Sequence, residues 1–436
     1  MTGAVLPRIL VIMGSGETAP TMAKVHRQLF SRLGPPPVPA VLLDTPYGFQ
    51  ENADEITARA LDYFRDNVGY PMTLAPFRGA EPDPLERATA VARARAAHYL
   101  FAGPGSPSYA LSHWCDTEVP SIVTDKLEHG GIVVFASAAA LTLGSHTVPV
   151  YEIYKVGESV RWLDGLDVLT RFGLPVAVIP HYDNAEGGSH DTRFCYLGEH
   201  RLAALETMLP PGHFVLGVDS HTALVLDLAV GTASVVGLGS VTVRVAGRSE
   251  VFEAGTTLPI DGLVQAARRL TDAATDAGRP AGSPALVAPD APHPAAAGVA
   301  ATARTPLDRE VRELEALFDE QLRDGRVPEA VRTTLAMDHL LLSWSRDTDG
   351  TDDLDRARQA FQSLIVRLGE RASQADDAGA TDRLAPLVEL LIDLRGRARA
   401  SRDFRQADWI RDALIEAGIE LRDGPDGTAW EARRDA

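Results

Sequence analysis

Short apolar runs alternate with helix-period segments over residues 8–262. The runs have the length of buried strands, and helical patterns lie between several of them, for example over 53–67 and 84–96. Nearly continuous apolar strands that alternate with helices are typical of a parallel sheet covered on both faces. The pattern therefore predicts a doubly wound, mostly parallel α/β fold. The predicted strands are Ile9–Met13, Ala40–Leu43, Tyr99–Ala102, Ile132–Ala136, Val176–Ile179 and Phe214–Val218.

Two further strand-like segments, Ser234–Leu238 and Val241–Val245, are joined through Gly239-Ser240. A short link that contains glycine between two such segments predicts a β-hairpin.

The pattern changes twice after residue 270. Ala, Pro and Gly dominate 271–305, and such a segment cannot bury enough apolar surface to fold, so we expect a linker there. From 306 to 436 apolar residues recur at helical spacing, beginning with Leu307, Val311 and Leu314. The sequence thus predicts an α/β domain over 1–270, a linker over 271–305 and a small all-helical domain over 306–436.

The composition fits a globular protein of more than one domain. The chain has 436 residues, of which 45% are hydrophobic and 23% charged. Its net charge of −18 argues against non-specific nucleic-acid binding by the whole molecule, although a local basic patch stays possible. Two cysteines, Cys115 and Cys195, make neither a disulfide framework nor a thiolate zinc site. With no secretory signal and no apolar stretch of about 18 residues, we expect a cytoplasmic protein without a membrane span.

A candidate active site begins where the strand Ile132–Ala136 runs into Ser137. A serine at a sharp turn from strand to helix projects its hydroxyl from the carboxyl edge of the sheet, where open α/β sheets place their sites. Taken alone, a serine among alanines at the start of a buried helix is more often an N-cap or packing residue. Glu152 follows along the chain, and His181 stands just past the strand Val176–Ile179. A histidine so placed suits a general base, which a carboxylate can orient.

The order of serine, acid and histidine, with these local contexts, resembles the serine-peptidase family of aspartyl dipeptidase (dipeptidase E) and cyanophycinase. The family's Trp-Ser-Ala-Gly-Ala elbow is similar to Ala136–Ala140, and its Pro-apolar-apolar-Asp run to Pro149–Glu152. Its Asn-Pro-His-Phe-x-Asn motif is similar to Ile179–Asn184. Its glycine loop is similar to Gly103–Ser106, and its Gly-Ile-Asp-Glu-x-Thr-Ala motif to Gly217–Ala223.

The resemblance covers roughly the first 250 residues and implies the class I glutamine-amidotransferase-like fold. It implies Ser137 as nucleophile, His181 as base and Glu152 as the acid that orients the base. The backbone N–H groups of Gly105 and Ala138 would form the oxyanion hole, and a peptide or aminoacyl substrate would react through an acyl-enzyme. No cofactor and no metal is implied.

Two residues are candidate contacts for substrate. Arg193 resembles the arginine of the family's Gly-Glu-Thr-Arg stretch and would pair with a substrate carboxylate through two hydrogen bonds. Asn184 is the asparagine of the histidine motif. A plain surface arginine is the alternative interpretation of Arg193.

The chain departs from the family pattern at the elbow and at the glycine loop. Phe135 and Ala139 stand where the family has glycine, and Pro104 has no N–H to donate. The acid is Glu rather than Asp. A catalytically degenerate domain in a binding protein is therefore an alternative hypothesis.

A second alternative is a nucleotide-binding enzyme. Gly14 and Gly16 follow the first strand in a G-x-G-x-x-A pattern, and Asp44 ends the next strand, as in dinucleotide sites. This alternative leaves the motifs around Ser137 and His181 unexplained.

Residues 391–430 carry a further pattern, which includes Asp403-Phe404, Ala407-Asp408 and Gly418-Ile419. The segment resembles the extreme C-terminus of cysteinyl-tRNA synthetases, although the synthetase signatures His-Ile-Gly-His and Lys-Met-Ser-Lys-Ser are absent. The resemblance raises RNA binding as a hypothesis, with a solvated helix face as the alternative. The candidate phosphate contacts are Arg395, Arg399, Arg402 and Arg405.

Together the two resemblances suggest a hydrolase whose helical tail binds tRNA, with an aminoacyl or peptidyl group on tRNA as the sharper substrate hypothesis. The sequence leaves the oligomeric state open.

Overall fold

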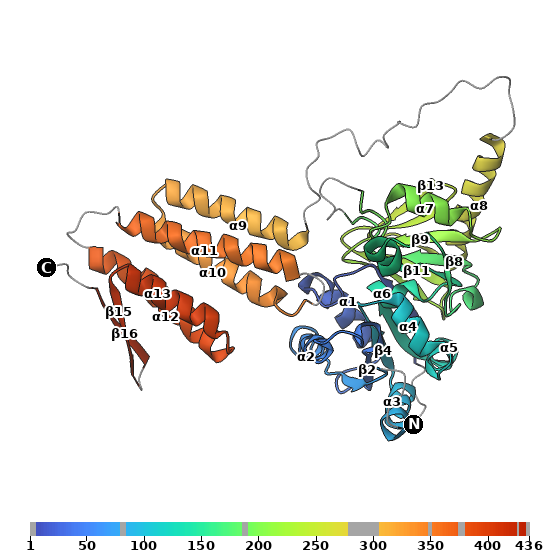
Figure 1. Cartoon of the computed structure of the whole chain (residues 1–436), viewed down its shortest axis with the longest axis horizontal. Coiled ribbons are helices and arrows are strands. Elements are labelled where there is room, and N and C mark those ends of the chain that lie inside the picture. Colours follow the sequence, from blue (N-terminus) through green and yellow to red (C-terminus); the bar gives the residue numbers. More distant parts are fainter. Residues whose placement is uncertain are drawn as a thin grey trace. The chain divides into compact units, whose positions relative to one another are not determined.

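The protein is described from a computed structural model (Figure 1). The structure describes residues 6–78, 84–184, 191–277, 305–347, 351–373, 380–424 and 427–432. The chain divides into two compact units, which comprise residues 1–303 with 343–351, and 304–342 with 352–436.

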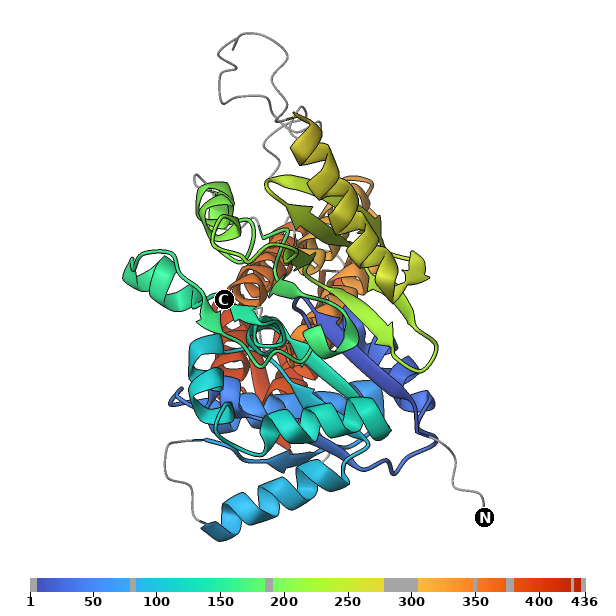
Figure 2. The same ribbon diagram turned by 90° about the vertical axis from the view of Figure 1, so that its right-hand side faces the viewer.

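An eight-stranded sheet forms the centre of the first unit, and Figure 2 shows its twist. Its middle and one side are parallel, from β1 through β5, β4 and β2 to β3, whereas β10, β11 and β14 add antiparallel strands beyond β1. The mostly parallel sheet predicted from the apolar runs is therefore confirmed. The order is β14 (Thr257–Pro259), β11 (Thr232–Gly237), β10 (Thr222–Asp227), β1 (Arg8–Met13), β5 (Gly131–Ala136), β4 (Tyr99–Ala102), β2 (Ala40–Leu43) and β3 (Thr73–Ala75).

Helices cover both faces of this sheet. Leu29, Phe30 and Tyr63 pack on one face, while Trp114 and Leu127 pack on the other. The doubly wound arrangement is thus confirmed. The helices are α1 (Pro20–Ser31) and α2 (Ala53–Tyr63) on the first face, and α3 (Pro84–Ala96), α4 (Pro107–Trp114) and α5 (Val119–His129) on the second.

Three loops meet at one edge of the sheet because their strands are parallel neighbours. Met13 pairs with Ala136, and Ala102 pairs with Phe135. The chain consequently leaves β1, β4 and β5 side by side, and the segments at 14–16, 103–106 and 137 gather there.

A second, four-stranded sheet corrects two sequence-based expectations. The two predicted strands Val176–Ile179 and Phe214–Val218 lie in this separate sheet. The hairpin between Ser234–Leu238 and Val241–Val245 is wrong, because β11 and β12 pair in different sheets. The order is β13 (Arg248–Glu253), β12 (Ser240–Val245), β9 (Phe214–Val218) and β8 (Val176–Ile179).

The true hairpin joins β12 to β13. Ala246 and Gly247 both have positive φ, of 48° and 75°, which is the geometry that closes a tight hairpin with the right twist. The short link before Ser240 instead carries the chain from one sheet to the other.

The remaining elements of the first unit are short, apart from its last helix. That helix runs past residue 270, so the start of the predicted linker is helical, while 278–304 lies outside the described residues. The elements are α6 (Ser137–Leu141), β6 (His146–Thr147), β7 (Leu163–Asp164), α7 (Gly198–Glu206) and α8 (Ile260–Ala277).

The second unit is helical, as expected, but it ends in an antiparallel pair of strands that the sequence analysis did not predict. Gly418, at φ 78°, ends α13, as glycine commonly does after a helix. The elements are α9 (Pro306–Arg323), α10 (Val327–Trp344), α11 (Thr351–Ser373), α12 (Ala380–Ala400), α13 (Phe404–Glu416), β15 (Ile419–Gly424) and β16 (Gly427–Ala432).

Candidate active site

Ser137 stands at a strained turn between β5 and α6. Ala136 is still extended, with φ −125° and ψ 153°, whereas Ser137 has φ 47°. A residue with a Cβ pays about 1–3 kcal/mol in this region, and such strain gathers at functional sites. Ala136 is the N-cap residue of α6, and the Ser137 hydroxyl is hydrogen-bonded to His181 rather than to the start of the helix. The geometry is therefore that of a nucleophile elbow rather than of a helix cap.

His181 lies at the carboxyl end of β8 with its ring turned to Ser137. Its Nε2 is 2.9 Å from the Ser137 Oγ. The loop is fixed by backbone hydrogen bonds, because Tyr182 N–H donates to Val218 O (3.1 Å) and Cys195 N–H donates to His181 O (3.1 Å). The structure thus brings two predicted residues into the contact that a nucleophile and its base require.

The predicted oxyanion donors lie on either side of this contact. Ala138 is in the first turn of α6, where helix geometry leaves the N–H without an intrahelical acceptor. Gly105 has φ 132°, and a Cβ there would stand 2.0 Å from Pro46 O, so only glycine fits. Ala139 N–H donates to Gly103 O (3.2 Å), which ties the glycine loop to α6.

The departures at the elbow are accommodated by packing. Phe135 is fully buried on the face of the sheet that α4 covers, and the centroid of its ring is 5.5 Å from that of Trp114. Ala139 and Ala140 belong to the same core cluster. Small neighbours on α6 therefore leave room for a large side chain where the family has glycine.

Glu152 is the first residue of a single π-helical turn, Glu152–Val156. Its carboxylate is hydrogen-bonded to Ser108 and not to His181, the partner expected from the sequence. Its Oε1 accepts a short hydrogen bond from the Ser108 hydroxyl, which also lies 3.0 Å from the Ser106 Oγ. Within the described ranges, no hydrogen bond joins Glu152 to His181. The structure therefore does not assemble the predicted Ser-His-Glu triad.

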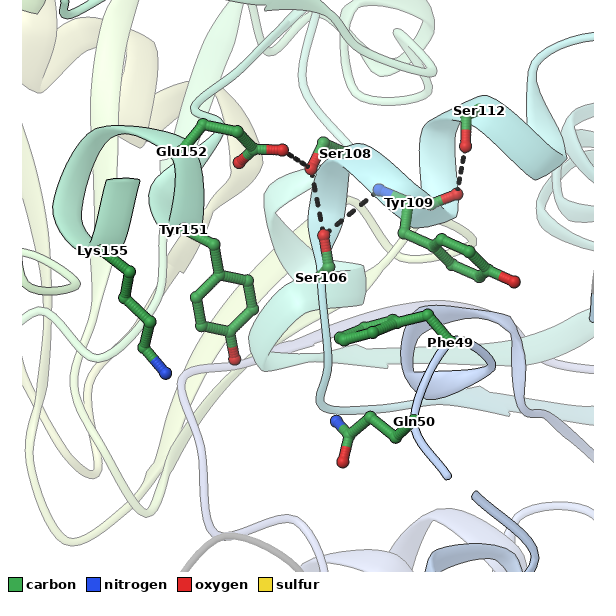
Figure 3. A pocket seen from close by; sticks show the side chains of 9 residues that line it. All are labelled: Phe49, Gln50, Ser106, Ser108, Tyr109, Ser112, Tyr151, Glu152 and Lys155. Atoms are coloured by element: carbon green, nitrogen blue, oxygen red, sulfur yellow. Dashed lines mark hydrogen bonds between the residues drawn. The ribbon is translucent and has the colours of Figure 1, made fainter. Parts of the chain in front are cut away.

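A pocket of about 750 Å³ opens beside this carboxylate (Figure 3). Glu152 is the one lining residue that the sequence predicts as a catalytic or binding residue. Ser108 and Ser112 are four residues apart on α4, a spacing that puts both on one helix face and that could have pointed to a polar wall. The lining residues are Phe49, Gln50, Ser106, Ser108, Tyr109, Ser112, Tyr151, Glu152 and Lys155.

Arg193 does not present a free guanidinium to substrate. Its Nε and Nη2 each donate to the Asp191 carboxylate at 2.8 Å, and this pairing lowers the pKa of Asp191 to about 2. Asn184 is buried, and its N–H donates to His181 O (3.2 Å). Arg193 is thus an exposed arginine paired with Asp191, whereas Asn184 lies directly beside His181.

The glycines of the first loop are explained by packing. A Cβ on Gly14 would stand 2.0 Å from Asp219 O, and one on Gly16 would stand 2.2 Å from the His221 ring. A dinucleotide pyrophosphate needs an open approach to such glycines, and here the chain's own turn fills that space. The nucleotide alternative thereby loses the observation that motivated it.

Asp219, in the same turn, has an unusual environment. Burial, together with the nearby charge of Asp183, raises the pKa of Asp219 to about 6. Its Oδ2 accepts hydrogen bonds of 2.8 Å from both the N–H and the hydroxyl of Ser240. The carboxyl group therefore joins the turn after β9 to the start of β12, its neighbour in the four-stranded sheet.

The four arginines of the predicted RNA patch divide into two pairs. Arg395 donates two hydrogen bonds of 2.8 Å to Asp423 on β15, and Arg399 adds a third at 3.1 Å. These contacts hold the pKa of Asp423 well below its usual range. Arg402 and Arg405 are exposed, and neither has an ion pair with any described residue. Two of the four are thus engaged within the fold.

Among the residues whose placement is described, no group of three His, Cys, Asp or Glu side chains is arranged to hold a metal ion. No helix of that part of the chain has the length and apolar character needed to cross a membrane.

No known family model matches the chain. Its C-terminal region is similar to cysteine–tRNA ligases. It is 35% identical over 146 residues to the ligase of Rhodospirillum rubrum, a match covering 29% of this chain and 31% of the ligase. With the ligase of Vibrio vulnificus it shares 51% over 69 residues, which is 16% and 15% of the two chains. The chain spans less than a third of the length of these relatives.

Two solved structures that are similar to this one are a peptidase and a putative peptidase E protein. A peptidase from an acI-B1 Actinobacterium has a TM-score of 0.47 at 20% identity, and the match covers 58% of this chain and 98% of that chain. A putative peptidase E protein from Listeria monocytogenes EGD-e has a TM-score of 0.34 at 12% identity, over 57% and 100%. Both TM-scores lie below 0.5, so the fold rests on the strand order and register given above.

Proposed function

We propose that the first unit is a serine hydrolase that cleaves a short peptide or an aminoacyl compound through an acyl-enzyme. One observation carries the proposal: a serine held at φ 47° on an elbow has its hydroxyl oxygen 2.9 Å from a histidine Nε2. This is the pairing that activates a weakly nucleophilic hydroxyl, because the imidazole can accept its proton during attack.

In the proposed reaction, the Ser137 Oγ bonds to the substrate carbonyl carbon as His181 takes the hydroxyl proton. The carbonyl oxygen becomes an oxyanion, and the N–H groups of Gly105 and Ala138 are the donors proposed to stabilise it. His181 then gives the proton to the leaving nitrogen or oxygen, and the acyl–enzyme forms. Water then attacks the carbonyl carbon of the acyl-enzyme ester while His181 takes its proton. His181 returns this proton to the Ser137 Oγ, which releases the acid and restores Ser137.

The third member of the triad stays a hypothesis. For Glu152 to orient the His181 ring, its carboxylate would have to leave Ser108. We therefore assign the reacting roles to Ser137 and His181 alone.

The test is covalent labelling with a fluorophosphonate probe, followed by mass spectrometry of the labelled peptide. We expect one label, on Ser137, because phosphonylation needs the serine to be activated by its base. Ser121, which is exposed on α5, provides the matched control as Ser121→Ala. A label that persists in Ser137→Ala would show that another residue is the reactive nucleophile. A well-folded wild-type chain that takes no label would favour the alternative of a catalytically degenerate binding protein.

For the second unit we propose contact with RNA phosphates through Arg402 and Arg405. The similarity to cysteine–tRNA ligases motivates this proposal, and both guanidinium groups are exposed. Phe404, between them, is 60% exposed, and its ring offers a face on which a base can stack.

The double variant Arg402→Ala/Arg405→Ala is expected to weaken tRNA binding and to lower the salt dependence of the affinity by about one unit of slope per arginine. Filter binding at several salt concentrations measures both quantities. Arg411→Ala is the control, because Arg411 on α13 is already paired with Asp408 and Asp412. Equal affinity for tRNA and for unrelated RNA would end the hypothesis of a tRNA-linked substrate.

A further inference from the structure

The pocket of Figure 3 carries two charged side chains, Glu152 and Lys155, both on the same π-helical turn. The two carboxylate oxygens of Glu152 differ. Oε1 accepts the hydrogen bond of Ser108, whereas Oε2 is buried and has no hydrogen-bond partner. A buried oxygen of a carboxylate that accepts nothing is costly, and a ligand that donates to it recovers that cost.

Lys155 supplies the opposite charge at the exposed side of the pocket. Its ammonium lies 4.8 Å from the centroid of the Tyr151 ring, and it forms no ion pair in the described part of the chain. The pocket therefore offers a sheltered anion and, separately, an open cation. A ligand complementary to both is a zwitterion with a protonated amine and an anionic group.

The walls between these charges are aromatic. The rings of Phe49 and Tyr109 lie 5.3 Å apart, and Phe49 is half exposed. Tyr151 faces the same cavity (Figure 3). Such a lining suits an apolar or aromatic side chain, and the volume of about 750 Å³ is in the range of small-molecule sites.

The pocket is joined to the elbow through α4. Ser106 lines the pocket, directly follows Gly105 and caps α4 by accepting from Tyr109 N–H (3.2 Å). Helix α4 in turn packs on α6, which begins at Ser137. A ligand in the pocket is thus next to the loop that carries a proposed oxyanion donor.

We infer that this pocket binds a short peptide as a zwitterion, with its free α-ammonium on Glu152 and its carboxylate on Lys155. Glu152 is then a residue that determines substrate specificity, not the acid that orients His181. The aromatic walls favour a neutral aromatic N-terminal residue over an aspartyl residue, whose second carboxylate Glu152 would repel. The catalytic consequence rests on the proposed function, but the binding itself does not.

Calorimetric titration of the full chain carrying Ser137→Ala tests the binding without turnover. The probes are Phe-Ala, N-acetyl-Phe-Ala, Phe-Ala amide and Asp-Ala. We expect Phe-Ala to bind at least about tenfold more tightly than each of the others, since each lacks one charge match or adds a repulsion.

Adding Glu152→Gln to this chain is expected to abolish the preference for Phe-Ala over N-acetyl-Phe-Ala. Adding Lys155→Met instead is expected to abolish the preference for Phe-Ala over Phe-Ala amide. Glu158→Gln is the control, because Glu158 lies just beyond the same turn, outside the pocket lining, and pairs with Arg161. Equal binding of the acetylated and free peptides, or no binding of Phe-Ala at millimolar concentration, overturns the inference.

Labelling separates this inference from the proposed function. The fluorophosphonate has no ammonium, so a Glu152→Gln chain whose labelling rate falls as steeply as its turnover of Phe-Ala would show that Glu152 serves His181. That outcome overturns the inference and keeps the hydrolase. A wild-type chain that binds Phe-Ala with the expected preferences but takes no label would keep the inference and overturn the proposed hydrolase.

Discussion

Ser137→Ala is expected to lower the rate of ester or peptide hydrolysis by at least about a thousandfold, and His181→Ala by a similar factor. The double variant should lose no more than either single variant, because a nucleophile and its base act as one unit. The 2.9 Å contact between Ser137 Oγ and His181 Nε2 is the structural reason. Turnover of a chromogenic ester, followed with the purified full-length variants, gives the three rates.

Two matched substitutions keep this result interpretable. Ser121→Ala and His129→Ala remove the same side chains from exposed positions on α5 and should retain wild-type turnover. Losses that multiply in the double variant, or a His181→Ala chain that remains nearly as active as the wild type, would show that the two side chains do not react together.

The largest expected loss of stability follows from Arg244→Met. Arg244 on β12 is 3% exposed, and it donates to Glu206 (2.9 Å) and to Glu199 (3.0 Å) on α7. Removing the guanidinium leaves the buried Glu206 carboxylate without its partner, which typically costs about 3–5 kcal/mol of folding free energy. Urea denaturation at neutral pH measures this difference.

A surface pair provides the contrast. Arg269 on α8 pairs with Glu250 but is exposed, so Arg269→Met should cost less than about 1 kcal/mol. Adding Glu206→Met to Arg244→Met should recover part of the loss, since the uncompensated charge is then gone. If Arg244→Met proves as mild as Arg269→Met, the network on α7 contributes little to stability.

The sequence predicted the parts of the fold that depend on local pattern. The strands Ala40–Leu43 and Tyr99–Ala102 have the predicted limits, because unbroken apolar runs between polar segments define buried strands well. The assignment of β8 and β9 to a second sheet could not be predicted, because an apolar run does not indicate which strand it pairs with. The strand β13 was missed because it alternates between exposed and half-buried residues at an edge.

The site divides in the same way. Ser137 and His181 could be found because each follows a recognisable strand end. Their strands lie in different sheets, so the contact between the two residues depends on the packing of α6 against β8. The partner of Glu152 depends on how α4 packs. The spacing of Ser108 and Ser112 indicates a polar face of α4 but does not show which residue that face meets. Likewise, the pairing of Arg395 with Asp423 needs the β15–β16 strands, whose short and exposed pattern gave no prediction.

The positive φ of Ser137 also bears on how this chain has been selected. Glycine would adopt that backbone without penalty, whereas any side chain pays for it in folding free energy. A lineage kept only for binding would gain stability by exchanging this serine for glycine, and the exchange takes a single substitution. Under the proposed function, a hydroxyl kept on a backbone that penalises every side chain is a trade of stability for reactivity.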